Sequence, residues 1–535
     1  MTRPAPAAPE SLLAIVQEAR QGPALICPDD GTVVSHRELA GAVHRLAGLL
    51  AGLGVERGQR VAIVLPNGPE IVQLLLAVAA VGATAAPMNP GYTAAEYRFY
   101  LADLDPSLLL VQTGRGADVR AAADGQRRIA DVSIQPDGPP RLSVAGTEAS
   151  RVRPFEPGTP EDVALLLHTS GTTKRPKQVP LLQRNLMASL RAIAAHYRLG
   201  DADVSYCAMP LFHVHGLLAS TLAQLAAGGS VVTPRRLTQR RYWQQITAHA
   251  VTWVSASPTI HSELVEHGTV PAPAIRFVRS CSSALSPGLM DRLEKIYEAP
   301  VLEAYGMTEA SHQMTSNPLP PQPHQPGSVG IPAGAHVRIV DQAGKELPAG
   351  QPGEVAVRGP GLTPGYLNDP EANAESFIGG GWFRTGDRGL LRGGYLWLGG
   401  RIKELIIRGG ENISPAEVED VLKAHPAVAD AACFGIDDEK YGQVVGAAVV
   451  LTAETDAAQL RERCRESLAE FKVPKVIHVV TEIPRTPTGK IQRTRIAAEL
   501  TGQGQPGQGQ PGQGQPGQGQ PGQGQPGQGQ PGQGR

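Results

Sequence analysis

The stretch VALLLHTSGTTKRPKQVP, residues 163–180, joins an apolar run to a turn rich in hydroxyl groups and cations. The apolar run 163–168 predicts a strand, and residues 182–196 after the turn predict a helix. Backbone N–H groups and hydroxyls in such a turn point beyond the strand, where a phosphate can bind. Taken alone, the stretch is more typical of a solvated basic turn, because clusters of Ser, Thr, Gly and Lys are common in loops.

Strand-like and helix-like segments alternate on both sides of this stretch. Residues 60–65 are apolar and β-branched, and residues 71–81 predict a helix that ends near Gly82. An extended segment follows at 84–90, which completes one βαβ unit and implies a mostly parallel sheet. Further strands are expected at 230–234, 251–256 and 274–280. After about Gly327 the pattern changes to short strands with glycine turns, which predicts a small β-rich subdomain.

The C-terminal part predicts a separate α+β domain of roughly a hundred residues, a normal size for an independent unit. Its first helix carries a capping-box pattern, with Ser414 at the N-cap, Pro415 at the first helical position and Glu417 at the third. Strands are expected at 427–436 and 444–451. A later helix is expected to place four residues on one face, namely Leu460, Cys464, Leu468 and Phe471.

The chain is therefore predicted to be an α/β protein with four parts. We expect a large N-terminal domain over 1–400, a hinge at 401–403, a small C-terminal domain over 404–500, and a disordered tail over 501–535. The tail repeats GQGQP, and no core can form from glycine, glutamine and proline alone.

Composition narrows the class of protein. The 535 residues are too many for one ordinary core, so at least two domains are expected. The 49 basic and 50 acidic side chains leave a net charge of −1, which gives no overall attraction to nucleic acid or to an anionic membrane. Five scattered cysteines without a C-x-x-C pair suit a reducing cytoplasm, and no segment is typical of a membrane span. The sequence assigns no oligomeric state.

Several common functional motifs are absent. The Walker pattern G-x-x-x-x-G-K-[ST] does not occur, and neither does G-x-S-x-G. His213 and His215 lack a third or fourth ligand at a spacing that suits zinc, so they are interpreted as pocket or packing histidines.

Six motifs that occur in a fixed order indicate the function of the turn after residue 168. They are HTSGTTKRPKQV (168–179), PLFHVHG (210–216), EAYGMTEAS (303–311), GWFRTGD (381–387), GRIKELIIRGGENISPAEVE (400–419) and PRTPTGKIQR (484–493). In this order and spacing, the chain resembles the adenylate-forming superfamily of acyl-CoA synthetases, luciferases and adenylation domains. The resemblance covers about residues 30–500. It implies a large nucleotide-binding domain followed by a small mobile domain, and an enzyme that uses ATP, Mg²⁺ and coenzyme A to convert a carboxylic acid to a thioester through an acyl adenylate.

The resemblance also assigns roles to individual residues. Tyr305 would stack on adenine, Asp387 and Arg401 would hold the ribose, and Lys403 would be the hinge residue. Thr308 would contact the α-phosphate, and Glu309 would hold the magnesium ion. Lys490 would bridge the acid and the α-phosphate, where a cation stabilises developing charge. The phosphate loop would include Thr169, Ser170, Gly171, Thr172, Thr173 and Lys177, and the loop that approaches the thiol-transfer site would include Gly409 and Gly410.

Within the superfamily, stretches such as PLFHVHGLLA, VRSCSSAL and EAYGMTEASHQMTSNPLP resemble the oxalyl-CoA synthetases of plants and fungi. The segments expected to form the acid pocket are rich in serine and histidine, which suits a second carboxylate because a buried unpaired charge is costly. Ser282 and His312 are predicted to lie near that carboxylate, and His213 at the junction of acyl group and thiol. These side chains could instead satisfy backbone groups in tight turns.

Two alternatives stay open. One is an acyl-CoA synthetase for a short or medium-chain monocarboxylate. The other is a non-catalytic nucleotide-binding relative, because Lys174 and Gln178 replace glycines that are usual in the phosphate loop and could stiffen it or force a disfavoured φ. Gln178 is the larger departure, and on the sequence alone Gln178→Gly is expected to leave adenylation intact or to improve it.

Overall fold

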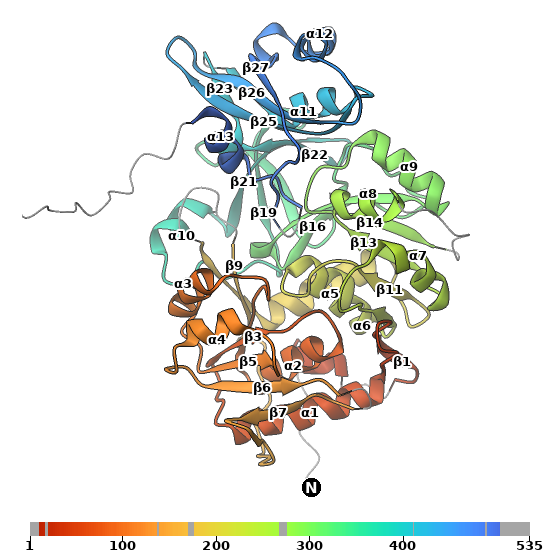
Figure 1. Ribbon diagram of the computed structural model, residues 1–535, viewed down its shortest axis with the longest axis vertical. Helices are drawn as coiled ribbons and strands as arrows, with labels where there is room; N and C mark the ends of the chain where they lie inside the picture. Colours follow the sequence, from red (N-terminus) through yellow and green to blue (C-terminus); the bar gives the residue numbers. More distant parts are fainter. Residues whose placement is uncertain are drawn as a thin grey trace, which may run out of the picture.

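The computed structural model describes residues 10–16, 20–135, 138–169, 176–266, 275–409, 411–486 and 489–502. Two large sheets dominate the N-terminal part, as predicted for an α/β protein (Figure 1). Ser170, Gly171, Thr172, Thr173, Lys174, Gly410 and nearly all of the tail lie outside the described residues. None of the described helices is long and apolar enough to cross a membrane.

The first large sheet has nine strands, and the pairings from β1 and β12 across to β15 are parallel. In order across the sheet, the strands are β17 (Ile331–Pro332), β16 (His312–Ser316), β15 (Val301–Met307), β14 (Phe277–Ser280), β13 (Trp253–Ala256), β11 (Val204–Cys207), β12 (Ser230–Val232), β1 (Pro23–Ile26) and β2 (Val33–Ser35). The strands expected at 230–234, 251–256 and 274–280 are thus β12, β13 and β14.

The second sheet has eight strands and contains the βαβ unit predicted from 60–90. In order, they are β10 (Gln178–Leu182), β9 (Val163–His168), β4 (Thr84–Pro87), β3 (Arg60–Val64), β5 (Leu108–Gln112), β6 (Ile129–Ser133), β7 (Arg141–Val144) and β8 (Thr147–Glu148). The opening stretch is therefore a hairpin-like pair, because β9 and β10 run antiparallel on either side of the turn.

Helices form three layers around the two sheets. A shared apolar core between the sheets includes η1 (Leu12–Val16), α1 (His36–Gly52), α2 (Pro69–Ala80), α5 (Gln183–His196), the π-helix η2 (His215–Leu222) and α6 (Ala223–Ala227). All twelve residues of α2 are buried, which explains why its sequence is apolar except at Glu70 and Gln73. The outer face of the first sheet packs against α7 (Gln239–Ala248), α8 (Pro258–Glu266) and α9 (Pro287–Tyr297), and that of the second against α3 (Ala94–Leu104) and α4 (Ala117–Ala123).

The small β-rich subdomain predicted after Gly327 is a five-stranded antiparallel sheet. It contains β18 (His336–Val340), β19 (Gly353–Arg358), β20 (Phe377–Ile378), β21 (Trp382–Arg392) and β22 (Tyr395–Arg401), with α10 (Pro370–Ser376) beside it. Figure 1 shows the C-terminal part, in blue, above β21 and β22 and at the opposite end of the molecule from the N-terminus.

The C-terminal part forms its own five-stranded sheet with a separate core. Its elements are β23 (Ile406–Arg408), β24 (Glu411–Ile413), α11 (Pro415–Lys423), β25 (Val428–Asp438), β26 (Gly442–Leu451), α12 (Ala457–Ser467), η5 (Glu470–Lys472), β27 (Val476–Val479) and α13 (Arg493–Thr501). Helices α11 and α12 contribute to one core cluster, and α13 contributes to another.

Two local predictions in this domain need correction. Ser414 is the N-cap of α11, but its side chain makes no capping hydrogen bond, and Glu417 accepts a hydrogen bond from Lys472 at 2.6 Å instead of completing a capping box. The predicted helical face is also shorter than expected. Helix α12 ends at Ser467, so Leu468 is its C-cap and Phe471 lies in η5, although both still pack on the same core.

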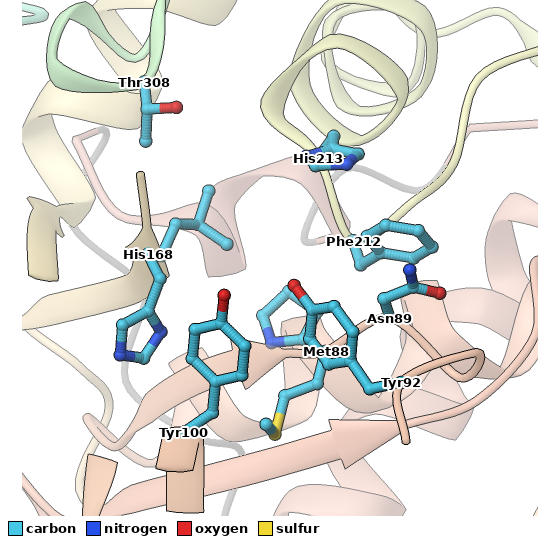
Figure 2. Close-up of a pocket in the computed structure, with 10 residues that line it drawn as sticks. Met88, Asn89, Tyr92, Tyr100, His168, Phe212, His213 and Thr308 are labelled. Carbon is cyan, nitrogen blue, oxygen red and sulfur yellow. The ribbon is translucent and has the colours of Figure 1, made fainter. Parts of the chain in front are cut away.

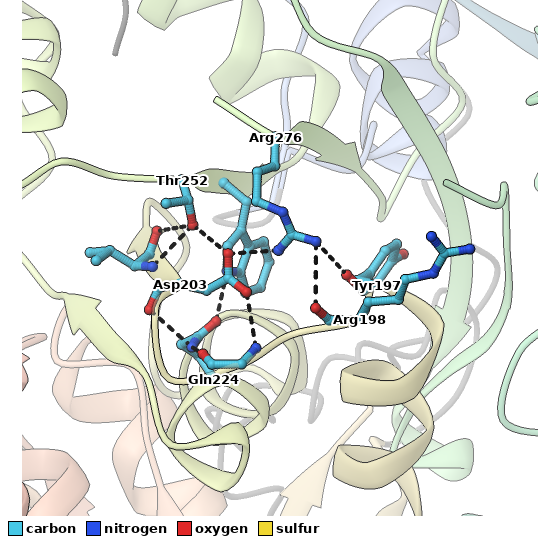
Figure 3. Close-up of polar contacts among 9 residues, drawn as sticks. Tyr197, Arg198, Asp203, Gln224, Thr252 and Arg276 are labelled. Atoms are coloured by element: carbon cyan, nitrogen blue, oxygen red, sulfur yellow. Dashed lines mark hydrogen bonds and ion pairs between the residues drawn. The ribbon is translucent and has the colours of Figure 1, made fainter. Parts of the chain in front are cut away.

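A polar cluster around the buried Asp203 links the starts of three parallel strands (Figure 3). The carboxylate of Asp203, just before β11, accepts hydrogen bonds from Thr252 at 2.9 Å and from Arg276 at 2.6 Å, just before β13 and β14. Arg276 also donates to the backbone oxygen of Tyr197. These contacts fix the start of β14. Arg279 lies on this strand, three residues after Arg276.

Candidate active site

The predicted ribose and adenine residues lie together where three strands meet. Tyr305 on β15 donates its hydroxyl hydrogen to Asp387 on β21, and both residues are buried. Asp387 pairs in register with Arg401 at the end of β22, and Arg401 Nε lies 2.9 Å from the other carboxylate oxygen. This carboxylate raises the pKa of Arg401. Three segments that are far apart in sequence therefore converge on one buried carboxylate.

Glu309 is buried beside this group without a cationic partner among the described residues. It lies in the short helix η3 (Thr308–Ala310) that follows β15, with 7% of its surface exposed. Its Oε1 accepts a hydrogen bond from Tyr366 at 2.8 Å. Because this buried carboxylate has no direct ion pair among the described residues, its geometry suits a metal ion. Mg²⁺ is commonly held by only one or two carboxylates together with substrate phosphates, which fits a single glutamate.

Thr169 and Lys177, at the two ends of the predicted phosphate loop, are joined by hydrogen bonds. The backbone N–H of Thr169 donates to the oxygen of Lys177 at 2.9 Å, and the N–H of Lys177 donates to Thr169 Oγ1 at 3.2 Å. The ammonium of Lys177 lies over the ring of Tyr366, 4.3 Å from its centre. Tyr366 therefore contacts both Lys177 and Glu309, and no motif in the sequence pointed to this tyrosine.

The interpretation of Gln178 as a phosphate-loop residue that could force a disfavoured φ is wrong. Gln178 is the first residue of β10, it is buried, and it does not have a positive φ. Its amide nitrogen donates to the backbone oxygen of Asp103 at 2.7 Å and to its carboxylate at 2.6 Å. The same carboxylate contacts His168 Nε2 at 3.0 Å. The glutamine therefore belongs to the strand and links it to α3, so glycine would remove structure rather than restore loop freedom.

We accordingly predict that Gln178→Gly lowers the free energy of unfolding by about 2 kcal/mol, because two hydrogen bonds are lost and glycine weakens a strand. Urea denaturation of the full chain measures this. As a control, Gln342→Gly changes an exposed glutamine in a turn and should stay within about 0.5 kcal/mol of the wild type. An unchanged denaturation midpoint in Gln178→Gly would contradict the structural role.

Lys490 reaches the same cleft from the C-terminal domain. Desolvation by the surrounding protein and the charge of Arg401 lower its pKa, while the carboxylates of Asp387 and Glu309 oppose that shift. Lys490 itself is exposed. The neighbouring Gly489 is buried, and a Cβ atom built there would lie 3.0 Å from Thr259 Oγ1. The lysine loop thus packs directly on the N-terminal domain, where only glycine fits.

Two further residues predicted to act in the C-terminal part are exposed. Lys403 is exposed in the single turn η4 (Ile402–Glu404), between the last strand of one domain and the first of the next. Gly409 is exposed, has a φ of 58°, and donates its N–H to the oxygen of Tyr441 at 2.7 Å.

A pocket lies at the carboxyl ends of β4 and β9 (Figure 2). Thr308 and His213 line it from the side of the first sheet, and the aromatic rings of Tyr92, Tyr100 and His168 line it from the second. Burial and the nearby Lys490 lower the pKa of His213 to about 4, so its imidazole is neutral at neutral pH. Sequence motifs gave no signal for the two tyrosines.

The two predicted acid-binding residues adjoin a buried arginine that the sequence reasoning missed. Arg279 on β14 is fully buried and donates to His312 Nε2 at 2.9 Å. It also lies 3.3 Å from His215 Nε2, and the other nitrogen of that ring lies 3.0 Å from Ser282 Oγ. Ser282 and His312 have φ values of 83° and 86°, a region that non-glycine residues rarely occupy and that clusters at functional sites. The available signal was a single arginine inside the apolar strand FVRS.

Comparison with known proteins places this geometry in a family. Residues 14–367 match the AMP-binding enzyme family, and residues 417–490 match the AMP-binding enzyme C-terminal domain. The chain therefore belongs to the AMP-binding enzymes.

Among individual proteins, the chain is similar to the oxalate–CoA ligase of Arabidopsis thaliana, with 44% identity covering 87% of this chain and 93% of that protein. It is also 41% identical to the oxalate–CoA ligase of Saccharomyces cerevisiae, covering 89% of this chain and 94% of that protein. A structure of O-succinylbenzoate coenzyme A synthetase from Bacillus subtilis with ATP and magnesium ion has a TM-score of 0.80 and 30% identity, covering 90% of this chain and 98% of that one.

Proposed function

We propose that this protein is an ATP-dependent acid–CoA ligase whose acid is oxalate. In the first half-reaction, a carboxylate oxygen of the acid attacks the α-phosphorus of ATP, and pyrophosphate leaves. In the second, the thiolate of coenzyme A attacks the acyl carbon, and AMP leaves with the bridging oxygen. The similarity to two oxalate–CoA ligases supports both the activity and the acid.

One observation in the structure supports oxalate, a dicarboxylate, as the acid. Arg279 is a fully buried cation with no carboxylate partner among the described residues, and all five of its hydrogen-bond partners are neutral. Leaving a buried charge unmatched is expensive, so the site is best satisfied when an anion binds beside it. A dicarboxylate supplies two anionic groups, one for Lys490 at the reacting end and one for the neighbourhood of Arg279.

The other side chains of the site would each contact a different part of ATP or its metal ion. Lys490 would stabilise charge at the α-phosphate and the reacting carboxylate. Asp387 would accept hydrogen bonds from the ribose beside its ion pair with Arg401, and Tyr305 would contact the adenine. Glu309 would hold Mg²⁺, which supplies charge neutralisation of the phosphates when bound.

Thr308 and the phosphate loop, from Thr169 to Lys177, would contact the phosphates. His213 is neutral and faces both Lys490 and the pocket, which suits the junction where the thiol meets the acyl group. We place the reaction in the cytoplasm, because all five cysteines are buried and free, as a reducing compartment allows.

The two alternatives lack comparable support. A monocarboxylate would leave Arg279 without an anion. A non-catalytic relative would not need Lys490 and Glu309 to lie near Asp387. Gln178 no longer supports a non-catalytic relative, because it lies in β10 without a positive φ.

A panel of acids tests the proposal. Purified protein is given ATP, Mg²⁺, coenzyme A and one acid at a time, and pyrophosphate release is measured with oxalate, malonate, succinate, acetate, butyrate and octanoate. Oxalate should give a kcat/KM at least about 100-fold above any monocarboxylate, since a site built to bond a polar group rejects a substrate that lacks it. Turnover with butyrate or octanoate but not with oxalate would disprove the assignment of the acid.

A further inference from the structure

We infer that Arg279 is a positioning residue that fixes the tautomer of two histidines, so that both hydrogen-bond donors of the acid pocket face the substrate. This inference rests on the proposed function, because the substrate group concerned is the second carboxylate of the acid. It starts from the fact that a guanidinium can only donate hydrogen bonds.

Arg279 first determines the state of His312. Its Nη2 lies 2.9 Å from His312 Nε2, so that nitrogen must accept, and the ring proton of neutral His312 must be on Nδ1. Nδ1 has no hydrogen-bond partner among the described residues. It faces Gly306, where an added Cβ atom would lie 3.3 Å away. Gly306 directly follows Tyr305 on β15, so the free N–H of His312 lies against the strand that carries Tyr305.

The same argument applies to His215. Its Nε2 lies 3.3 Å from Arg279 Nη1 and 2.7 Å from Ser255 Oγ, and Ser255 Oγ accepts from Arg279 at 3.1 Å. Ser255 therefore donates its hydrogen to His215 Nε2. The proton of His215 is then on Nδ1 and points at Ser282 Oγ, 3.0 Å away. Because Ser282 accepts this bond, its own hydroxyl hydrogen is left free to donate to the acid.

The buried environment and nearby positive charge keep the rings of His215 and His312 neutral. Burial, with a contribution from the positive charge of Arg279, lowers the pKa of both His215 and His312 well below the ordinary value. The rings stack on each other with centres 5.1 Å apart, so a proton on either would face a second cation nearby. The pocket thus has one fixed positive charge and two neutral donors, which matches a single carboxylate group.

The test compares two amides at position 312. The side-chain nitrogen of asparagine can occupy the place of histidine Nδ1, whereas that of glutamine reaches the place of Nε2. His312→Asn should keep kcat/KM for oxalate within about 10-fold of the wild type, and His312→Gln should lose about 100-fold or more, mainly through the KM for oxalate. The KM for ATP should stay within about 3-fold in both variants.

A double-mutant cycle separates this role from a purely structural one, since asparagine also tolerates the positive φ at position 312 better than glutamine does. Without the guanidinium, nothing selects the tautomer of a histidine at position 312, whereas the amide of asparagine has no tautomer to select. Arg279→Met should therefore lower kcat/KM for oxalate by about 10-fold more when residue 312 is histidine than when it is asparagine. If Arg279→Met does not fold, Arg279→Lys serves, because one ammonium cannot satisfy both rings.

Equal activity of His312→Asn and His312→Gln would overturn the inference, and so would an effect of Arg279→Met that is the same with histidine and with asparagine at position 312. Failure of the wild type to use oxalate would overturn the proposed function as well, and that result is seen before any variant is made.

Discussion

Lys490→Ala is expected to slow oxalate-dependent pyrophosphate release by about 10³-fold. The ammonium is the cation that the C-terminal domain brings to the cleft shared by Asp387, Glu309 and Arg401. The loss should fall on the first half-reaction only, since the thiol attack needs no cation at the α-phosphate. Conversion of a supplied acyl adenylate and coenzyme A to thioester should therefore change by less than about 10-fold, measured by chromatography of the thioester.

A matched control for Lys490→Ala is Lys475→Ala. Lys475 is also on the C-terminal domain, with 63% of its side chain exposed and an ion pair to Asp438. Removing it should leave both half-reactions within about 2-fold, because surface ion pairs contribute little. Equal loss of both half-reactions in Lys490→Ala would contradict the role of this lysine as an adenylation group.

Glu309→Gln is the second large effect that we expect, with adenylation slowed by about 10²- to 10³-fold. Glutamine keeps the hydrogen bond to Tyr366 but removes the negative charge. The apparent affinity for Mg²⁺, measured from the dependence of pyrophosphate release on magnesium concentration, should weaken at the same time.

Tyr366→Phe controls for packing around Glu309, because it removes only the 2.8 Å hydrogen bond to the carboxylate. This variant should lose no more than about 10-fold and keep a magnesium dependence close to that of the wild type. If Glu309→Gln instead retained the magnesium dependence of the wild type, Glu309 would not be the residue that holds the metal.

The sequence predicted the fold well because apolar periodicity is a local signal. Helix α2 and strands β3 and β4 follow directly from the run of apolar residues between 60 and 90. Capping was harder to predict, since side chains at a helix start can find other partners. Glu417 fits a capping box by position, but a lysine from another segment lies within 2.6 Å and takes its carboxylate.

Site residues that belong to a sequence motif could be predicted. Site residues whose role depends on contacts with distant parts of the chain could not. Tyr305, Asp387 and Arg401 stand in separate motifs that fold together. Arg279 has no motif of its own, and its importance comes from being buried beside two histidines that are distant in sequence. Gln178 was misjudged for a similar reason, because its partner Asp103 is 75 positions away.

The most direct test of the central claim is oxygen transfer from oxalate to AMP. The full chain is incubated with ¹⁸O-labelled oxalate, ATP, Mg²⁺ and coenzyme A, and the AMP and thioester are analysed by mass spectrometry. Formation of an acyl adenylate requires the bridging carboxylate oxygen to leave with AMP, so each AMP should carry one labelled oxygen for each oxalyl-CoA formed. AMP without label, or thioester formed without AMP, would contradict an oxalate–CoA ligase that works through an adenylate.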